Sequence, residues 1–262
     1  MLEVKQLCAG YPSKQVLNHI DLTIPAGQVT VILGPNGCGK STLLKTLCGI
    51  LPVQSGQLHL DGENLLTLAP KQLARKMAYL AQGRQVPDIS AYRLVLHGRF
   101  PHLGYPRRYR KEDYDCARAA MEQMGIWDLA DTLLENLSGG QRQKVYIAMA
   151  MAQDTPVVLL DEPTTYLDIS HQLQLMQQAK HLARQGKTVL MIIHDLPHAF
   201  QTADKLILME NGSIVSEGTP EELYASRSID SVFHVKLSRT QTESGWKYYC
   251  EEAHHEPFST QH

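Results

Sequence analysis

The feature that most constrains the fold of this chain is a glycine-rich run near its start. Residues 34–41 read Gly-Pro-Asn-Gly-Cys-Gly-Lys-Ser and match the pattern G-x-x-x-x-G-K-[ST]. An apolar segment of strand type, Val29–Leu33, precedes the run, and a segment of helix type, Lys40–Cys48, overlaps its end. A strand, a glycine loop and a helix in this order point backbone N–H groups and the positive end of the helix at an anion. The run therefore predicts a phosphate-binding loop, and a glycine-rich turn without a ligand is the alternative.

Two side chains of this loop have distinct predicted roles in binding a nucleoside triphosphate. Lys40 is expected to reach the β- and γ-phosphates, and Ser41 is expected to ligate Mg²⁺. The expected ligands are therefore ATP and Mg²⁺. The residues predicted to surround the phosphates are Gly34, Pro35, Asn36, Gly37, Cys38, Gly39, Lys40, Ser41 and Thr42.

A pair of acids ends a second apolar segment. Asp161 and Glu162 directly follow Val157–Leu160, which is typical of a buried strand. Ligands of parallel α/β sheets gather at the carboxyl ends of the strands. Asp161 is expected to hold Mg²⁺ there, directly or through water, and Glu162 to polarise the water that attacks the γ-phosphate. A solvated Asp-Glu turn is the alternative for this pair taken alone.

The order of the segments predicts an α/β fold. Strand and helix patterns alternate on both sides of residues 88–154, which indicates a mostly parallel sheet. Residues 88–154 themselves have a helical texture, with helices expected at Glu112–Met124 and Gly139–Ala152 and a loop at Phe100–Lys111. This interval predicts an inserted helical subdomain.

Composition limits the partners that the chain can have. The formal net charge is −2, so no overall attraction to nucleic acid is expected. The longest apolar runs, Val157–Leu160 and Val189–Ile193, are far below the ~20 residues of a membrane helix. Five cysteines without a C-x-x-C pair favour a reduced, cytosolic chain. The basic run Arg107–Lys111 is interpreted as a solvated loop in preference to a nucleic-acid patch, because acidic residues follow it at once.

A family resemblance becomes visible at Leu137-Ser138-Gly139-Gly140-Gln141, which resembles the signature of ABC-type ATPases. The resemblance then extends over nearly the whole chain. It implies that Tyr11 stacks on adenine, that Gln82 contacts Mg²⁺, that Tyr166-Leu167-Asp168 forms a loop crossing a dimer interface, and that His194 contacts the γ-phosphate. The catalytic set that it implies is Glu162, His194, Gln82 and Lys40, with Ser41, Gln82 and Asp161 as metal ligands. The implied fold is a P-loop NTPase core, with a RecA-like mixed sheet and an antiparallel β subdomain, plus the inserted helices.

The same resemblance implies how such a chain works. ATP would lie between two copies, and Ser138, Gly139, Gly140 and Gln141 of one copy would complete the site of the other. Gly98–Gly104 resembles the corresponding segment in importers of iron–siderophore complexes, haem and cobalamin. The expected partners are therefore a second copy, a polytopic permease and, indirectly, a substrate-binding protein, with no nucleic acid, at the cytoplasmic face of the inner membrane. A soluble ABC ATPase acting in cofactor or cluster assembly without transport is the alternative.

The resemblance also divides the chain. Residues 1–237 are expected to form the ATPase domain and residues 238–262 a C-terminal extension. A short hairpin of Val235–Leu237 and Trp246–Tyr249 is expected across this boundary, ahead of a polar tail. The histidines of the polar tail form only a weak metal-binding pattern, because they lie in a frayed segment without fixed spacing: His254, His255 and His262.

Overall fold

The centre of the molecule is a six-stranded sheet, seen in a computed structural model that describes residues 1–83, 86–165, 167–243 and 245–252. The strand order is β10-β9-β3-β8-β7-β6, with only β10 antiparallel to its neighbour. Three central strands are buried at every position, which requires cover on both faces. The strands are β3 (Val29–Leu33), β6 (Met77–Leu80), β7 (Val157–Asp161), β8 (Thr188–Ile192), β9 (Lys205–Glu210) and β10 (Ser213–Gly218).

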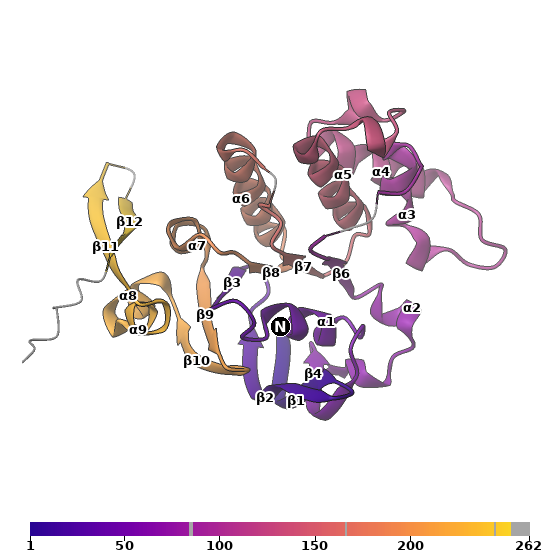
Figure 1. Cartoon of the computed structure of the whole chain (residues 1–262). Helices are drawn as coiled ribbons and strands as arrows, with labels where there is room; N and C mark the ends of the chain where they lie inside the picture. Colours follow the sequence, from indigo (N-terminus) through magenta and orange to yellow (C-terminus); the bar gives the residue numbers. More distant parts are fainter. Residues whose placement is uncertain (84–85, 166, 244, 253–262) are drawn as a thin grey trace, which may run out of the picture.

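The sheet separates two apolar cores. Along β3, Val31 and Leu33 face one core while Ile32 faces the other, as the alternation of side chains along a strand requires. Helices α5 (Gly139–Ala152) and α6 (Ile169–Arg184) cover the first face, and α1 (Lys40–Leu47) covers the second (Figure 1). This sandwich fixes the loops at the carboxyl ends of β3, β6, β7 and β8.

A second sheet lies beyond α1. Its antiparallel strands have the order β2-β1-β4-β5, and their buried positions pack on α1 and on the second core. The antiparallel subdomain was predicted, but the bounds of its strands were not, because the strands are longer than their apolar runs. The bounds are β1 (Leu2–Tyr11), β2 (Lys14–Ile24), β4 (Val53–Leu60) and β5 (Glu63–Asn64), followed by the short helix α2 (Pro70–Leu73).

The inserted helices stand over the end of the sheet that carries β6 and β7 (Figure 1). They are α3 (Ala91–His97), α4 (Lys111–Gln123) and α5. Phe100–Lys111 was expected to be a loop throughout, but Phe100–His102 forms a 3₁₀ turn and α4 begins at Lys111. Arg107 from the basic run places its guanidinium 4.9 Å from the centre of the Phe100 ring. Further 3₁₀ turns are at Leu65–Thr67, Trp127–Leu129 and Leu134–Asn136.

A buried ion pair holds the inserted helices together. Arg99 Nε lies 3.0 Å from Asp113 Oδ1, and another guanidinium nitrogen of Arg99 donates to the carbonyl of Ala152 at the end of α5. Burial alone would raise the pKa of Asp113, but hydrogen bonds from the Arg110 N–H and from Arg99 outweigh it and hold this pKa below its usual range. The ionised form of Asp113 is therefore the one that the fold favours.

We expect Asp113→Ala to destabilise the chain by about 3–5 kcal/mol, because it leaves the Arg99 charge buried without its partner. Urea unfolding measures the loss, and Asp113→Leu combined with Arg99→Leu should recover most of it. A carboxylate whose pKa is lower in the folded than in the unfolded state stabilises the fold at pH values above its unfolded-state pKa. This stabilisation is lost as the pH falls through the folded-state pKa. The difference in free energy of unfolding between wild type and Asp113→Ala should therefore become smaller as the pH falls below about 4. A constant difference down to pH 2 would contradict this assignment.

The chain ends in short elements that pack outside β9 and β10. Asn211 and Gly212 join those two strands with positive φ at both residues, +47° and +78°, as a two-residue hairpin turn requires. Helix α7 (Leu196–Thr202) precedes these two strands in the chain. After them come α8 (Pro220–Ser226), α9 (Ser228–Phe233) and a hairpin of β11 (Val235–Thr242) and β12 (Gly245–Glu252). The predicted hairpin exists, and it is longer than expected. Tyr166, His254, His255 and His262 lie outside the described residues. Within the described part of the chain, none of the helices has the length and apolar character needed to span a bilayer.

Candidate functional site

The glycine loop after β3 closes around the Lys40 side chain. Lys40 Nζ donates to the carbonyls of Gly34 at 2.7 Å and Pro35 at 2.8 Å. Gly34 is required there, because a Cβ would lie 2.2 Å from the carbonyl oxygen of Met209 on β9. Gly39 has φ of +108° and immediately precedes α1, so the backbone can turn sharply into the helix. The ammonium group is thus held at the mouth of the loop, with only 6% of the residue exposed.

Asp161 ends β7 beside this loop. Its Oδ1 accepts a hydrogen bond from Ser41 Oγ at 2.9 Å, and its Oδ2 accepts one from the Tyr79 hydroxyl at 3.0 Å. Burial raises the pKa of Asp161, although both hydroxyl hydrogen bonds act in the opposite direction. The carboxylate is therefore an anion in a poorly solvated place, where a cation would relieve the cost of its charge.

We expect Asp161→Asn to raise the melting temperature of the nucleotide-free chain, because it removes a buried charge and keeps the shape. The rise should be a few degrees, at roughly 2–4 °C for each kcal/mol in a chain of this size. The same substitution should abolish the extra stabilisation that Mg²⁺ adds to ATP. Thermal unfolding with ATP alone and with ATP plus Mg²⁺ measures both effects. A lower melting temperature, or an intact Mg²⁺ increment, would show that the charge has another role.

Glu162 directs its carboxylate into the same region. It has φ of +50°, a left-handed conformation that is uncommon for a residue with a side chain and is found at functional sites. Oε2 accepts a hydrogen bond from Gln82 Nε2, and Oε1 lies 2.5 Å from His194 Nε2. The two residues follow β6 and β8, the strands on either side of β7, and they contact one carboxylate oxygen each.

These side chains line one cavity of about 620 Å³. It is lined by the glycine loop and the start of α1, by Glu162 and His194, and by Tyr11 and Lys14. Tyr11 is 41% exposed, so its ring is accessible to a planar group. Residues from five distant parts of the sequence are thus brought together: Tyr11, Asn36, Gly37, Gly39, Lys40, Ser41, Thr42, Gln82, Glu162 and His194.

The predicted signature residues lie elsewhere. Ser138 caps α5 and forms a reciprocal pair with Gln141, each backbone N–H donating to the side chain of the other residue, at 3.0 and 3.2 Å. With Gly140 and Asp168 they line a separate hollow of about 380 Å³. Asp168 caps α6 and pairs with His171 at 2.9 Å. Ser138, Gly140 and Gln141 of one chain therefore do not line the cavity of its own glycine loop.

The residues present fit Mg²⁺ with a nucleotide. The Ser41 hydroxyl, the Asp161 carboxylate and the Gln82 amide supply oxygen, which hard cations prefer. Among the described residues there is no cluster of three or more His, Cys, Asp or Glu side chains able to hold a metal ion alone. Mg²⁺ commonly binds through one or two protein groups together with phosphate oxygens and water. The donor set suits a metal that arrives with the nucleotide.

Two contacts in the site were not predicted. The Tyr79 hydroxyl on β6 contacts Asp161, and Gln143 on α5 donates to the Pro163 carbonyl just after Glu162, at 2.9 Å. Both depend on which elements are neighbours. The contact between Tyr79 and Asp161 could have been predicted only from the pairing of β6 with β7, which the sequence does not show.

Comparisons with known proteins show the family of this chain. The ABC transporter family matches residues 17–165. The ferric enterobactin transport ATP-binding protein FepC of Escherichia coli is 43% identical over 237 residues, covering 90% of this chain and 88% of the relative. The iron(3+)-hydroxamate import ATP-binding protein FhuC of Bacillus subtilis is 41% identical, covering 89% and 88%.

Solved structures give the same result. A chain of a transporter assigned to the metal-chelate ABC type, in an inward-facing conformation, is 26% identical with a TM-score of 0.82, covering 95% of this chain and 97% of that one. The dimeric bacterial cassette MJ0796 is also 26% identical, with a TM-score of 0.74 and coverage of 84% and 99%. The predicted fold, with its antiparallel sheet and helical insert, is therefore confirmed. The chain belongs to the ABC transporter family and is one of its ATP-binding subunits, an ATPase.

Proposed function

We propose that this chain hydrolyses ATP to drive the import of an iron–siderophore complex, or of a related metal chelate such as haem or cobalamin, through a separate permease. The observation that carries the proposal is the cavity that joins the glycine loop to Glu162 and His194. The cargo is inferred from the relatives, which serve ferric enterobactin and ferric hydroxamates.

The chemistry follows from the positions of the side chains. Lys40 and the loop N–H groups bind the β- and γ-phosphates. Bound Mg²⁺, held through Ser41, Gln82 and Asp161, would neutralise phosphate charge. Glu162 orients the attacking water and accepts its proton as the new P–O bond forms. His194, which touches the Glu162 carboxylate, stabilises the charge of the γ-phosphate as the bond to the leaving ADP breaks.

A complete site requires two copies. Members of this family dimerise, as in the dimeric cassette, and work with permeases. We assign Ser138, Gly139, Gly140, Gln141 and Asp168 to the nucleotide held by the partner copy, because none of them lines the cavity of their own glycine loop. Ser138, Gly140, Gln141 and Asp168 line a separate hollow. ATP then closes the pair and hydrolysis opens it.

The assembly follows from this assignment. The paired chains would dock on a polytopic permease at the cytoplasmic face of the inner membrane, and a substrate-binding protein would deliver the chelate on the other side. Residues 1–237, with the helical insert at about residues 88–154, form the ATPase domain in this proposal, and residues 238–262 are an extension of it.

The transport claim is tested with the tagged full-length chain captured from detergent-solubilised membranes. Mass spectrometry should identify a polytopic permease among the bound proteins, and cells carrying Glu162→Gln should fail to take up radioactive iron supplied as the siderophore. Recovery of soluble cluster-assembly proteins alone, with normal uptake, would leave the ATPase chemistry intact and overturn the import function.

A further inference from the structure

The helix that follows His194 is too short to hold its own position. α7 has seven residues and begins two residues after His194, with Asp195 as its cap. Asp195, which follows His194 in the chain, accepts a hydrogen bond at Oδ1 from the His198 N–H at 2.7 Å. Isolated helices of this length are unstable in water, so packing must set where α7 lies. Because His194 lies between β8 and α7, the contacts that α7 makes contribute to the position of His194.

The C-terminal hairpin packs on α7. The rings of Phe200 on α7 and Tyr248 on β12 have centroids 4.8 Å apart and are inclined by 46°. Both residues are buried, at 3% and 6% exposure. Lys247 Nζ, beside Tyr248, also lies 3.4 Å from the Gln201 side-chain oxygen. An aromatic pair of this kind contributes about 0.5–1.5 kcal/mol beyond its buried area.

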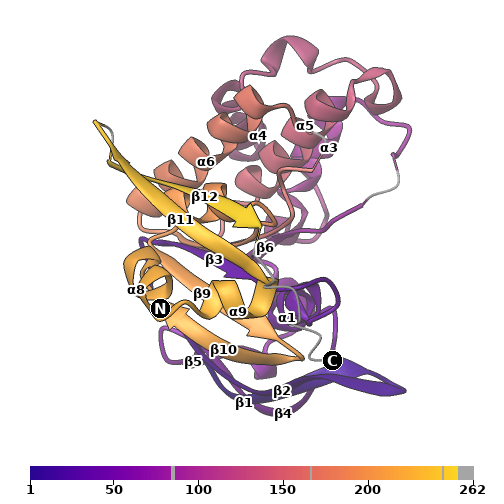
Figure 2. The same ribbon diagram turned by 60° about the vertical axis from the view of Figure 1, so that its left-hand side comes forward.

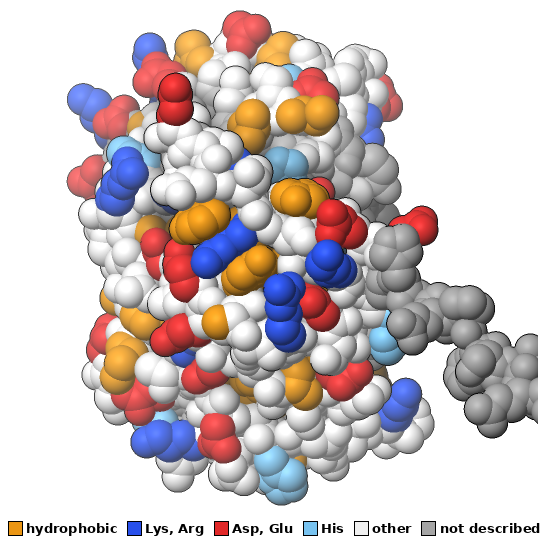
Figure 3. Space-filling model, turned by 90° about the vertical axis from the view of Figure 1, so that its left-hand side faces the viewer, with side chains coloured by type: hydrophobic (Ala, Val, Ile, Leu, Met, Phe, Trp, Pro, Cys, Tyr) orange, Lys and Arg blue, Asp and Glu red, His pale blue; other side chains and the backbone are white. Residues whose placement is uncertain are grey.

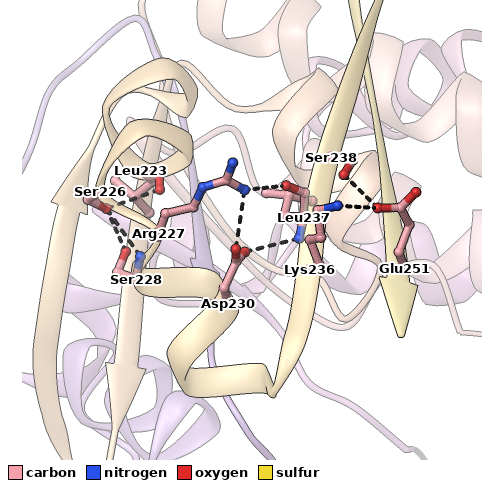
Figure 4. A network of polar contacts seen from close by, with 9 residues as sticks. All are labelled: Leu223, Ser226, Arg227, Ser228, Asp230, Lys236, Leu237, Ser238 and Glu251. Atoms are coloured by element: carbon pink, nitrogen blue, oxygen red, sulfur yellow. Dashed lines mark hydrogen bonds and ion pairs between the residues drawn. The ribbon is translucent and has the colours of Figure 1, made fainter. Parts of the chain in front are cut away.

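The base of the hairpin is fixed to α8 and α9. Asp230 on α9 accepts from the Leu237 N–H at 3.0 Å, and an Arg227 guanidinium nitrogen donates to the Leu237 carbonyl at 2.8 Å and to Asp230 at 3.2 Å (Figure 4). Both polar groups of one β11 residue are thus bound by one ion pair. Figure 2 shows the hairpin rising from these two helices.

Aromatic contacts stiffen the hairpin on the same side. The Arg239 guanidinium lies between two rings, 4.4 Å from the centre of Tyr224 and 4.1 Å from that of Trp246. Tyr224 on α8 also meets Tyr248 edge-on, with centroids 5.8 Å apart. Tyr248 therefore contacts α7 and α8 at once, and it links the anchored end of the chain to the helix after His194.

The outer face of this region has a different character. Figure 3 views the molecule from the hairpin side, where Lys and Arg, Asp and Glu, and single hydrophobic side chains are interspersed. Tyr249, next to Tyr248, is 43% exposed on the opposite face of β12. The inner face thus carries the specific contacts, and Tyr249 provides a matched control for Tyr248.

We propose that Tyr248 is a positioning residue for ATP hydrolysis: through Phe200 and α7 it sets the distance between the His194 imidazole and the Glu162 carboxylate. The inference rests on the role of His194 in the proposed function. A hairpin that only covered the apolar side of α7 would change stability without changing turnover. Errors of about 1 Å in such geometry can cost up to 10²-fold in rate.

The test uses the full-length chain and compares Tyr248→Ala with Tyr249→Ala. Tyr248→Ala should lower kcat for MgATP about 10-fold with KM for ATP within twofold of wild type. Tyr249→Ala should leave both unchanged, and Tyr248→Phe, which keeps the ring, should restore kcat. Thermal unfolding is recorded for each variant, and Tyr248→Leu replaces Tyr248→Ala if the latter does not fold. An unchanged kcat for a folded Tyr248 variant would overturn the proposal.

A double-mutant cycle shows whether the effect passes through His194. His194→Ala should lower turnover, and adding Tyr248→Ala to it should cause no further loss, measured as radioactive phosphate released over long incubations. An equal further loss would overturn the positioning role and leave the role of His194 intact. Wild-type turnover by His194→Ala would instead remove His194 from the proposed function, and a 10-fold loss in Tyr248→Ala would then have another cause.

Discussion

Glu162→Gln should stop ATP hydrolysis and leave ATP bound. The amide keeps the size of the side chain and can still contact Gln82 and His194, but it cannot accept the proton of the attacking water. Loss of a general base lowers rates by about 10²–10⁴-fold. The measurement is phosphate release from the chain in its permease, alongside nucleotide affinity from fluorescence titration.

A matched control for Glu162→Gln is Glu63→Gln, which removes an exposed carboxylate paired with Lys76 far from the cavity. The control should retain wild-type turnover. If Glu162→Gln also hydrolyses ATP at the wild-type rate, the water is activated by another group. If it loses ATP affinity, Glu162 has a structural role in the cavity.

The second large effect is expected for Lys40→Ala, which should weaken ATP binding about 10- to 100-fold. A hydrogen bond to a charged group contributes about 1.5–3 kcal/mol, and each 1.4 kcal/mol is a factor of ten in affinity. The lysine also bonds two carbonyls of its own loop, so its loss leaves the loop without its central donor. The measurement is titration with a fluorescent ATP analogue.

Lys5→Ala is the control for the loss of one positive charge from the chain, because Lys5 is exposed on β1 and pairs with Glu3. It should bind ATP as tightly as wild type. An unchanged ATP affinity in Lys40→Ala would mean that the backbone N–H groups alone hold the phosphates. The role assigned to the ammonium group would then be wrong.

Local patterns in the sequence predicted the parts of the site that follow strands. A glycine loop after an apolar strand, and two acids after another, follow from chain-local rules, and the structure places Lys40, Ser41 and Asp161 within one connected group. Gln82 and His194 were named as site residues through the resemblance, because neither residue has a local signal of its own. Their contacts with Glu162 were not predicted. The sequence alone could not show that β6 and β8 flank β7.

The contacts that sequence analysis missed depend on tertiary neighbours. Tyr79 meets Asp161 across paired strands, and Arg99 meets Asp113 between α3 and α4. The hairpin was found from its β-type residues, but its packing on α7 was not, because the contact of Phe200 with Tyr248 joins segments separated by helices and strands. Such pairs carry no periodic pattern that a single sequence reveals.

The mass of the chain in solution tests the shared site most directly. Glu162→Gln, which should keep ATP bound, is measured by light scattering with and without MgATP, and again with Ser138→Arg added. The account predicts that MgATP doubles the mass from 29.4 kDa and that Ser138→Arg prevents the doubling while each chain still binds ATP. A chain that binds ATP and stays at the monomer mass, or a dimer that forms equally well with Ser138→Arg, would contradict the proposal that Ser138 completes the site of a second copy.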